Sequence, residues 1–324
     1  MAEWLVEQGI GEHRAVRLAG GTIDAALVDW PGPLAAGQVA DAVLIARSAG
    51  SPRGTVRFDG GEEALADRLP QDASEGAALR MEVTRAALGE KGRRKLAQAR
   101  PSTAPPCPAP TLTEQLRRNG HTVSIVHQFP GCDWDELHAE ARTGELAFAG
   151  GQLIVSPTPA MTLIDIDGAL PPRALALAAV PALSAAIARL GLAGSIGIDF
   201  PTLPDKADRR AVDDALAAAL AGWPHERTAM NGFGFVQLVA RLDRPSLVQR
   251  IAADRPGAAA RLLLRRAERI AEPGALLLTA HPAVHAAIQP AWEAELARRS
   301  GRTIRRRDDP ALALAGGFAQ AVPL

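Results

Sequence analysis

The chain has 324 residues, of which 47% are hydrophobic; this excludes a disordered chain and predicts two or more subdomains. Its 36 basic and 36 acidic residues cancel, so net charge does not indicate a polyanionic partner, which only local charge can reveal. The two cysteines, Cys107 and Cys132, are too few for a disulfide framework and lack the CxxC spacing of a zinc site.

The N-terminal sequence contains acids where a secretion signal needs a basic region and an apolar core. The most apolar long segment, Ala174 to Leu190, includes Pro181 and Arg189, and predicts a packed helix instead of a membrane span. We therefore expect a cytoplasmic protein with no membrane partner.

Residues 3–30 alternate apolar and polar positions on both sides of Gly20-Gly21, which predicts a β-hairpin that turns at this glycine pair. Short strand candidates follow between clusters of Gly, Pro and Asp, and their spacing predicts a small β-barrel. These candidates are Val39–Ile45, Gly54–Phe58 and Leu79–Thr84.

Two basic regions are candidates for phosphate contacts. The first is the run Glu90-Lys91-Gly92-Arg93-Arg94-Lys95, which a soluble turn explains equally well. The second spans Arg241 to Arg307, with 14 Arg against 6 Asp and Glu, and it is equally explained as a solvated helical surface. Between them, five prolines from Pro101 to Pro110 predict a stiff connector.

After the connector, helical and strand patterns alternate, so the predicted fold class is α+β with a small C-terminal unit of its own. The expected helices are Thr113–Arg118, 133–141 with Asp133 as N-cap, Pro171–Leu190 with a kink or restart at Pro181, Asp205–Leu220, Ala258–Ile270 and Ala283–Arg299. The expected strands are Val123–His127, Gln152–Ser156, Met161–Asp167, Ser195–Phe200, Gly232–Ala240, Ala275–Thr279 and Arg302–Arg305.

Three aspartates follow apolar strand patterns. Asp165 and Asp167 are two residues apart, so their side chains share one face of a strand, and Asp199 ends a second strand. If the two strands are neighbours, the carboxylates converge on one cation. An all-oxygen set predicts Mg²⁺, with Mn²⁺ as an alternative and zinc excluded, and Mg²⁺ polarises phosphoryl oxygens. Acids after strands are also ordinary turn formers and helix N-caps.

Other motifs are weak. His281 and His285 have the spacing of helical metal ligands, but Pro282 lies between them and helix-start packing explains them better. The Gly232-Phe-Gly234 segment lacks the rest of a phosphate-binding loop, and no GxSxG, Walker or Rossmann pattern occurs.

Three ordered segments resemble the ribonuclease E/G family. GGQLIVSPTPAMTLIDID, from Gly150 to Asp167, is similar to the strand pair that leads to the family's first catalytic aspartate. GSIGIDF, from Gly194 to Phe200, resembles the segment with the second aspartate. ERTAMNGFG from Glu226, with the RPSL sequence that ends at Leu247, is similar to the strand and tail that follow.

The resemblance implies a modular protein that cleaves single-stranded RNA with magnesium, leaving 5′-phosphate and 3′-hydroxyl ends. The implied parts are a ribonuclease-H-like subdomain (1–34 plus 111–148), an OB-type RNA-binding insert (35–100), a proline-rich connector (101–110), a deoxyribonuclease-I-like catalytic subdomain (149–247) and a small C-terminal α+β subdomain (248–324). In this interpretation Asp165 and Asp199 hold Mg²⁺, and Asp167 orients the metal water or adds a ligand. The expected RNA contacts are Arg57, Phe58, Lys91, Arg93, Arg94, Lys95, Lys206, Arg209 and Asn231.

The chain also departs from the family pattern. No CPxCxG motif follows Leu247, so no zinc-linked dimer is expected, and the connector stands where the family has a domain that senses RNA 5′ ends. Asp167 occupies a position where Asn is usual, and the loop after it is shortened to Gly168–Pro171, so reduced activity is expected. Two alternatives follow: a catalytically silent RNA-binding protein, and an interaction protein that does not bind nucleic acid.

Overall fold

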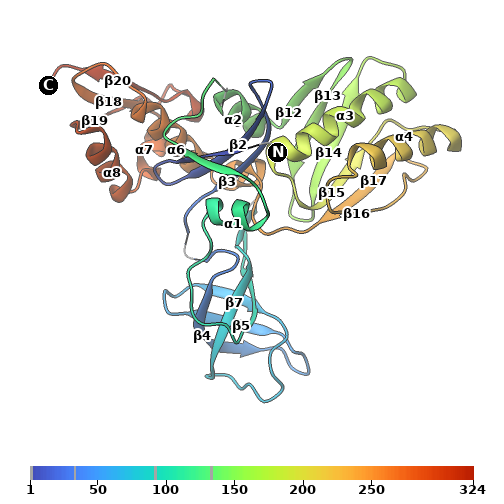
Figure 1. The fold of residues 1–324 in the computed structure, drawn as a ribbon, viewed down its shortest axis with the longest axis horizontal. Coiled ribbons are helices and arrows are strands. Elements are labelled where there is room, and N and C mark those ends of the chain that lie inside the picture. Colours follow the sequence, from blue (N-terminus) through green and yellow to red (C-terminus); the bar gives the residue numbers. More distant parts are fainter. Residues whose placement is uncertain (1–2, 33, 91–92, 132–133) are drawn as a thin grey trace.

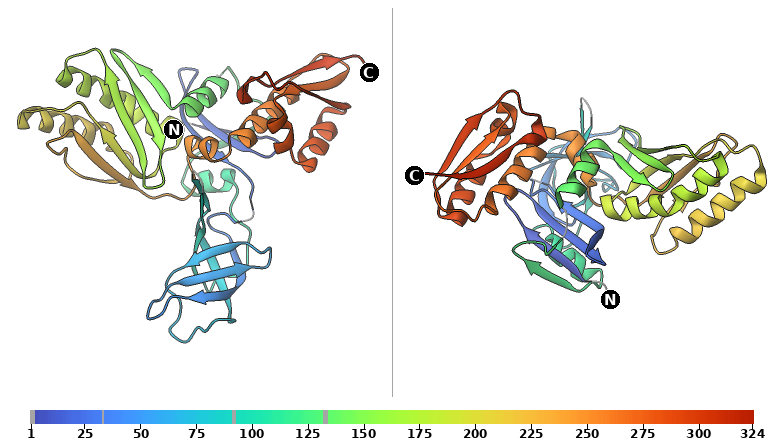
Figure 2. Two further views of the ribbon diagram at one scale, coloured as in Figure 1. Left: turned by 180° about the vertical axis from the view of Figure 1, so that it is seen from behind. Right: turned by 90° about the horizontal axis from the view of Figure 1, so that it is seen from above.

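Mixed helices and strands form three units around a central four-stranded sheet, which confirms the α+β class (Figure 1). The structure is a computed structural model that describes residues 3–324 apart from 33, 91–92 and 132–133; the side chains of 90, 93 and 94 also lie outside this description. A barrel projects on its own from the centre. A six-stranded sheet and the C-terminal unit lie on opposite sides of the central sheet (Figures 1 and 2).

The central sheet has the order β11-β1-β2-β3. Its strands are β1 (Trp4–Gln8), β2 (His13–Ala19), β3 (Thr22–Asp29) and β11 (Val123–Val126). β2 and β3 form the predicted hairpin, and both glycines of the Gly20-Gly21 turn have positive φ. Helix α1 (Leu112–Arg118) begins with a capping box between Thr111 and Glu114 and buries Leu112 and Leu116 under this sheet.

The predicted barrel is closed, with the order β10-β6-β5-β4-β7. Its strands are β4 (Val39–Arg47), β5 (Gly54–Phe58), β6 (Glu63–Ala66), β7 (Ala78–Arg85) and β10 (Ala97–Pro101), and a hairpin of β8 (Leu88–Glu90) and β9 (Arg93–Lys95) extends from it. β6 and β10 close the barrel as its one parallel pair. The connector runs along the barrel, where Cys107 and Val39 exchange backbone hydrogen bonds of 2.9 and 3.0 Å.

The six-stranded sheet carries its two long helices on one face. In spatial order its strands are β12 (Glu145–Phe148), β13 (Gly151–Pro157), β14 (Thr162–Gly168), β15 (Gly194–Asp199), β17 (Phe235–Ala240) and β16 (Glu226–Arg227). β12 was grouped with the preceding segment on sequence, but it pairs with β13 at the edge of this sheet. Helices α3 (Pro172–Leu190) and α4 (Lys206–Ala219) cover one face, and α2 (Trp134–Thr143) packs between this sheet and the centre (Figure 2).

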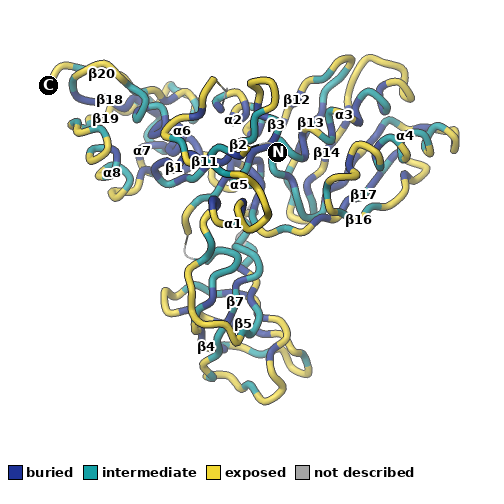
Figure 3. The backbone as a smooth tube through the Cα atoms, viewed as in Figure 1, coloured by how far each residue is buried: buried dark blue, intermediate teal, exposed yellow. Residues whose placement is uncertain are grey.

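Helix α3 runs through Pro181 without the expected restart. Among the described helices, it alone is long and apolar enough to cross a membrane. Eight of its residues are buried, and they pack in the main hydrophobic core, where α3 contacts β3, β13 and β14; Figure 3 shows the burial along the chain.

The C-terminal unit contains a three-stranded sheet of order β19-β18-β20. Its elements are α5 (Leu247–Ala253), α6 (Arg255–Glu268), β18 (Ala275–Ala280), α7 (Pro282–Ala287), α8 (Pro290–Ser300), β19 (Ile304–Asp308), a 3₁₀ turn (Leu314–Gly316) and β20 (Phe318–Val322). The single helix expected over Ala283–Arg299 is wrong, because Pro290 cannot continue a helix and starts a new one. As expected, His281 caps a helix start: its Nδ1 accepts from the Ala283 N–H at 3.1 Å.

A buried ion-pair network joins the central sheet to α6. The Glu7 carboxylate, 4% exposed, accepts from Arg14 at 2.6 Å, Arg265 at 2.9 Å and Arg269 at 3.2 Å. Arg14 also pairs with Glu12. Burial works to raise the pKa of Glu12, but the Arg14 charge and a hydrogen bond from the Trp30 indole hold it below its ordinary value.

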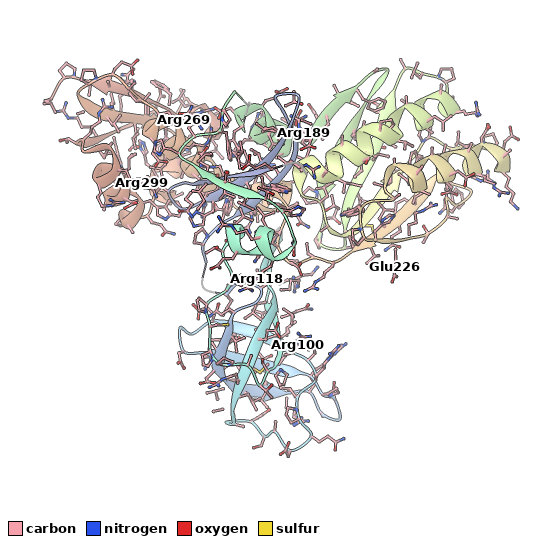
Figure 4. The ribbon with its side chains drawn as sticks, in the orientation of Figure 1. Arg100, Arg118, Arg189, Glu226, Arg269 and Arg299 are labelled. Carbon is pink, nitrogen blue, oxygen red and sulfur yellow. The ribbon has the colours of Figure 1, made fainter. Side chains whose placement is uncertain are left out.

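Several of the excess arginines between Arg241 and Arg307 belong to this network or lie beside it. Arg261 and Arg265 are buried, the Arg250 side chain is 9% exposed, and burial lowers the pKa of Arg250 to about 10. Arg269 and Arg299, labelled in Figure 4, pair with Glu7 and with Glu268, and Arg299 is exposed. Neither predicted alternative, a phosphate-binding surface or a solvated helix, therefore describes Arg250, Arg261, Arg265 and Arg269, which contact the central sheet or the turn between β1 and β2.

Candidate metal centre on the open face of the six-stranded sheet

The candidate aspartates meet on the sheet face that the helices leave open. Asp165 of β14 and Asp199 of β15 are directly paired in parallel register. Paired residues of neighbouring strands point to the same face, and neighbouring strands lie about 4.8 Å apart. The row continues to Glu145 and Ile154 on one side and to Phe235 on the other.

The local sequence places these carboxylates outside the core. Ile164 and Ile166 alternate with the aspartates of β14 and are buried under α3 with Ile198 of β15. The period of two that buries these isoleucines turns Asp165 and Asp199 to solvent, and both are exposed. The two strands are neighbours, which is the condition that the predicted convergence of the carboxylates requires.

Among the described residues, the two carboxylates have no compensating charge. Over the part of the chain that the structure describes, neither Asp165 nor Asp199 has an ion pair or a hydrogen bond to its side chain, and the same is true of Asp167. Like charges directly opposite each other on adjacent strands destabilise a sheet. A cation bound between them would remove this repulsion, which is what a metal site provides.

The donor set fits Mg²⁺. In the described residues, His, Cys, Asp and Glu nowhere form a group of three or more arranged for a metal ion. Zinc sites need three or four such ligands, whereas Mg²⁺ is usually held by one or two carboxylates and keeps several waters. The pair of Asp165 and Asp199 therefore has enough ligands for Mg²⁺ but too few for a zinc site.

Asp167 lies one step further along the same face, opposite Gln152 of β13. The short loop after it turns tightly: a side chain at Gly168 would meet the Gly150 carbonyl oxygen at 2.5 Å, and Leu170 closes over Gly150. Asp167 is therefore on the right face, one residue pair from the Asp165 and Asp199 row, and the close backbone packing holds it there.

An apolar patch borders the carboxylates. Gly197 lies between Ser195 and Asp199 on the open face, and a Cβ there would meet Phe235 at 2.6 Å and Met161 at 2.9 Å. Because Gly197 has no side chain, Phe235 and Met161 lie flat over β15. The open face thus offers a charged end beside an apolar surface.

Phe233 is a candidate that sequence reasoning missed. It is 82% exposed, and it sits in the turn before β17, whose first residue is paired with Asp199. The Asn231 side-chain oxygen accepts from the N–H groups of Phe233 at 2.9 Å and Phe235 at 3.0 Å, which fixes this turn. The signal was present in the sequence as an aromatic residue between two glycines, a pattern typical of a turn.

The barrel contacts expected from sequence divide into two groups. Arg57 is exposed on β5 and pairs with Glu63 across the strand at 2.9 Å. Phe58 points the other way, is 5% exposed and belongs to the barrel core, so the expectation that it faces RNA is wrong. Strand alternation decides this, because adjacent residues of β5 cannot share a face.

The basic run is only partly described. Lys91 lies outside the described residues, and so do the side chains of Arg93 and Arg94, whose backbone pairs with Glu90 and Gly89 in the β8-β9 hairpin. Lys95 is half-buried, and its Nζ donates to the Pro159 carbonyl at 2.6 Å. The hairpin therefore touches the turn between β13 and β14.

The remaining predicted contacts follow Asp199 or precede β17. Lys206 is exposed at the start of α4. The Arg209 guanidinium donates to the carbonyls of Leu203 at 2.5 Å and Pro204 at 2.7 Å, so it braces the loop after Asp199. Asn231 is exposed but acts locally as the turn-forming residue described above.

Comparison with known proteins adds no assignment: the chain matches no protein-family model, and no curated protein is significantly similar to it. Any function must therefore be argued from the motifs and from the open face itself.

Proposed function

We propose that the protein is a magnesium-dependent endoribonuclease of the ribonuclease E/G type that cleaves single-stranded RNA. The observation that carries this proposal is the pair Asp165 and Asp199, directly opposed on parallel strands, exposed and without a cationic partner among the described residues. The three family-like segments fall on β13 to β17, around this pair.

In the proposed mechanism, Asp165 and Asp199 hold the ion and Asp167 accepts a hydrogen bond from the attacking water. Bound magnesium would supply charge stabilisation at the phosphoryl oxygens. Water attacks phosphorus in line, a new P–O bond forms, and the bond from phosphorus to the 3′ oxygen breaks. The products are a 5′-phosphate and a 3′-hydroxyl end.

The barrel supports an RNA substrate. Numbered along the chain, its five strands close in the order 1-2-3-5-4, with strands 3 and 5 parallel. This strand order supports our proposal that residues 35–100 form an OB-type module, and such modules bind oligonucleotides. In the same scheme the central sheet corresponds to the ribonuclease-H-like part and the six-stranded sheet to the deoxyribonuclease-I-like part.

The proposal is tested by incubating the purified chain with a labelled single-stranded RNA of about 20 nucleotides, with Mg²⁺ or with a chelator. We expect cleavage only with the metal, partial activity with Mn²⁺, and products that a 3′-ligation assay identifies as carrying 3′-hydroxyl ends. Cleavage that persists in chelator, or that yields 2′,3′-cyclic ends, contradicts the proposed chemistry.

The second candidate is a catalytically silent RNA-binding protein. The observation that favours it is Asp167 in place of the usual Asn, beside the shortened Gly168–Pro171 loop. It predicts RNA affinity that falls steeply with salt and no cleavage in Mg²⁺.

Replacing Phe233 by alanine is expected to weaken single-stranded RNA binding by about 1–3 kcal/mol, because an exposed, fixed aromatic ring can stack on one base. Fluorescence anisotropy with labelled RNA measures this loss. Phe318 offers a matched control, since it is 39% exposed but lies on β20 of the C-terminal unit. Equal losses for Phe233→Ala and Phe318→Ala exclude a specific stacking role.

A further inference from the structure

A cavity of about 570 Å³ lies at the other end of the open face, away from the aspartates. Its walls come from the β8-β9 hairpin, the end of α2, the turn between β13 and β14, the start of β15, and α5. Ser195 lines it on β15, four residues before Asp199. At about 3.3 Å per residue, the cavity is roughly 13 Å from the metal centre.

The charge of this cavity has one sign. Lys95, Arg142 and Arg255 line it, and no Asp or Glu is among its lining residues in the described part of the chain. The Ser156 hydroxyl adds neutral hydrogen-bonding capacity, whereas the Thr158 hydroxyl donates to the Met161 carbonyl at 2.7 Å and the Gln249 side-chain oxygen accepts from the Ser246 N–H. Two of these cations, Arg142 and Arg255, contrast with the buried arginines Arg14 and Arg265, which pair with Glu7.

No interaction within the described protein explains why Arg142 and Arg255 occupy these positions. Arg142 and Arg255 are both exposed, and neither makes an ion pair or a side-chain hydrogen bond within the described residues. Arg255 is the first residue of α6, where the positive end of the helix dipole makes a cation unfavourable. The Asp254 carboxylate caps this helix by accepting from the Gly257 N–H at 2.9 Å, and an anion in the cavity would add a direct partner for Arg255.

We infer that this cavity binds a phosphate group of the RNA chain, upstream or downstream of the cleaved bond. This inference rests on the proposed function for the source of the phosphate. Stacked nucleotides rise about 3.4 Å each, so roughly four of them span the distance from the metal centre. A guanidinium pair suits a phosphate because each can donate two parallel hydrogen bonds.

The test compares the wild-type chain with an Arg142→Gln, Arg255→Gln double variant and with Arg307→Gln as the control. Arg307 is an exposed arginine of β19, remote from the cavity. Binding of inorganic phosphate is followed by ³¹P NMR, and binding of a 20-nucleotide RNA by anisotropy at several salt concentrations. Thermal unfolding of each variant checks that the fold is retained, since both cavity arginines are at the surface.

The double variant is expected to bind phosphate at least tenfold more weakly than wild type. Its RNA affinity is expected to fall by about tenfold or more, and the slope of log affinity against log salt to decrease by about 0.7, the contribution of one lost phosphate contact on a single strand. Arg307→Gln should change neither quantity.

Two results overturn the inference. If wild type and double variant bind phosphate equally, or neither binds it, the cavity is not an anion site. If phosphate binding is lost while RNA affinity and its salt slope stay unchanged, the ligand is a free phosphate or nucleotide and not an RNA chain. A protein that binds RNA through this cavity but does not cleave it would refute the ribonuclease proposal and leave this inference standing.

Discussion

Replacing Asp199 or Asp165 by asparagine is expected to lower the rate of RNA cleavage by about a thousandfold or more. Each change removes one of the two negative charges that would hold the magnesium ion, and metal stabilisation of the phosphoryl transition state is worth several kcal/mol. At about 1.4 kcal/mol per factor of ten, that loss corresponds to at least three orders of magnitude. Single-turnover cleavage of labelled RNA measures it.

RNA binding should survive in both variants, because the proposed phosphate and base contacts lie elsewhere. Glu145→Gln provides the matched control: Glu145 is exposed in the same row of the sheet, two strands from Asp165, and belongs to no proposed ligand set. Cleavage that is unaffected by Asp165→Asn and Asp199→Asn would show that the active centre lies elsewhere. A comparable loss in Glu145→Gln would point to a general charge effect of the open face.

The second large effect is expected for stability. Replacing Glu7 by alanine removes the carboxylate shared by Arg14, Arg265 and Arg269, and leaves two nearly inaccessible guanidinium groups without this partner. Breaking one partner out of a buried ion pair typically costs about 3–5 kcal/mol, a large part of the 5–15 kcal/mol that stabilises an ordinary domain. A drop of about 10 °C in the unfolding midpoint is therefore expected in a thermal melt.

Glu63→Gln is the control for this experiment. It breaks the exposed pair between Arg57 and Glu63 on the barrel, and exposed pairs contribute about 1 kcal/mol or less. Because Glu7 joins the central sheet to α6, tryptophan fluorescence should report the loss through Trp30 and Trp134, which lie beside the network. An unchanged melting curve for Glu7→Ala would mean that the network does not hold the C-terminal unit.

Much of the fold could be predicted from local patterns. The glycine pair at 20–21 and the alternating residues around it predicted the β2-β3 hairpin, because a tight turn and period-two burial are properties of a short segment. The strands of the barrel missed on sequence, β6 and β10, are short segments such as Glu63–Ala66, in which alanine weakens the strand signal. The helix break at Pro290 was visible in the sequence but was overridden by the helical composition around it.

For the candidate site, too, some features were predictable from the sequence and others were not. The sequence alone determined that Asp165, Asp167 and Asp199 end buried strand patterns, because alternation along a strand depends only on neighbouring residues. The tertiary structure decided that β14 and β15 are adjacent and in a register that opposes Asp165 to Asp199, since register is set by core packing under α3. The tertiary structure also placed Phe58 in the barrel core and paired C-terminal arginines such as Arg265 with acids that are distant in sequence. It left Phe233, Arg142 and Arg255 exposed to solvent. Contacts between distant segments depend on the packing of whole units, which no local pattern records.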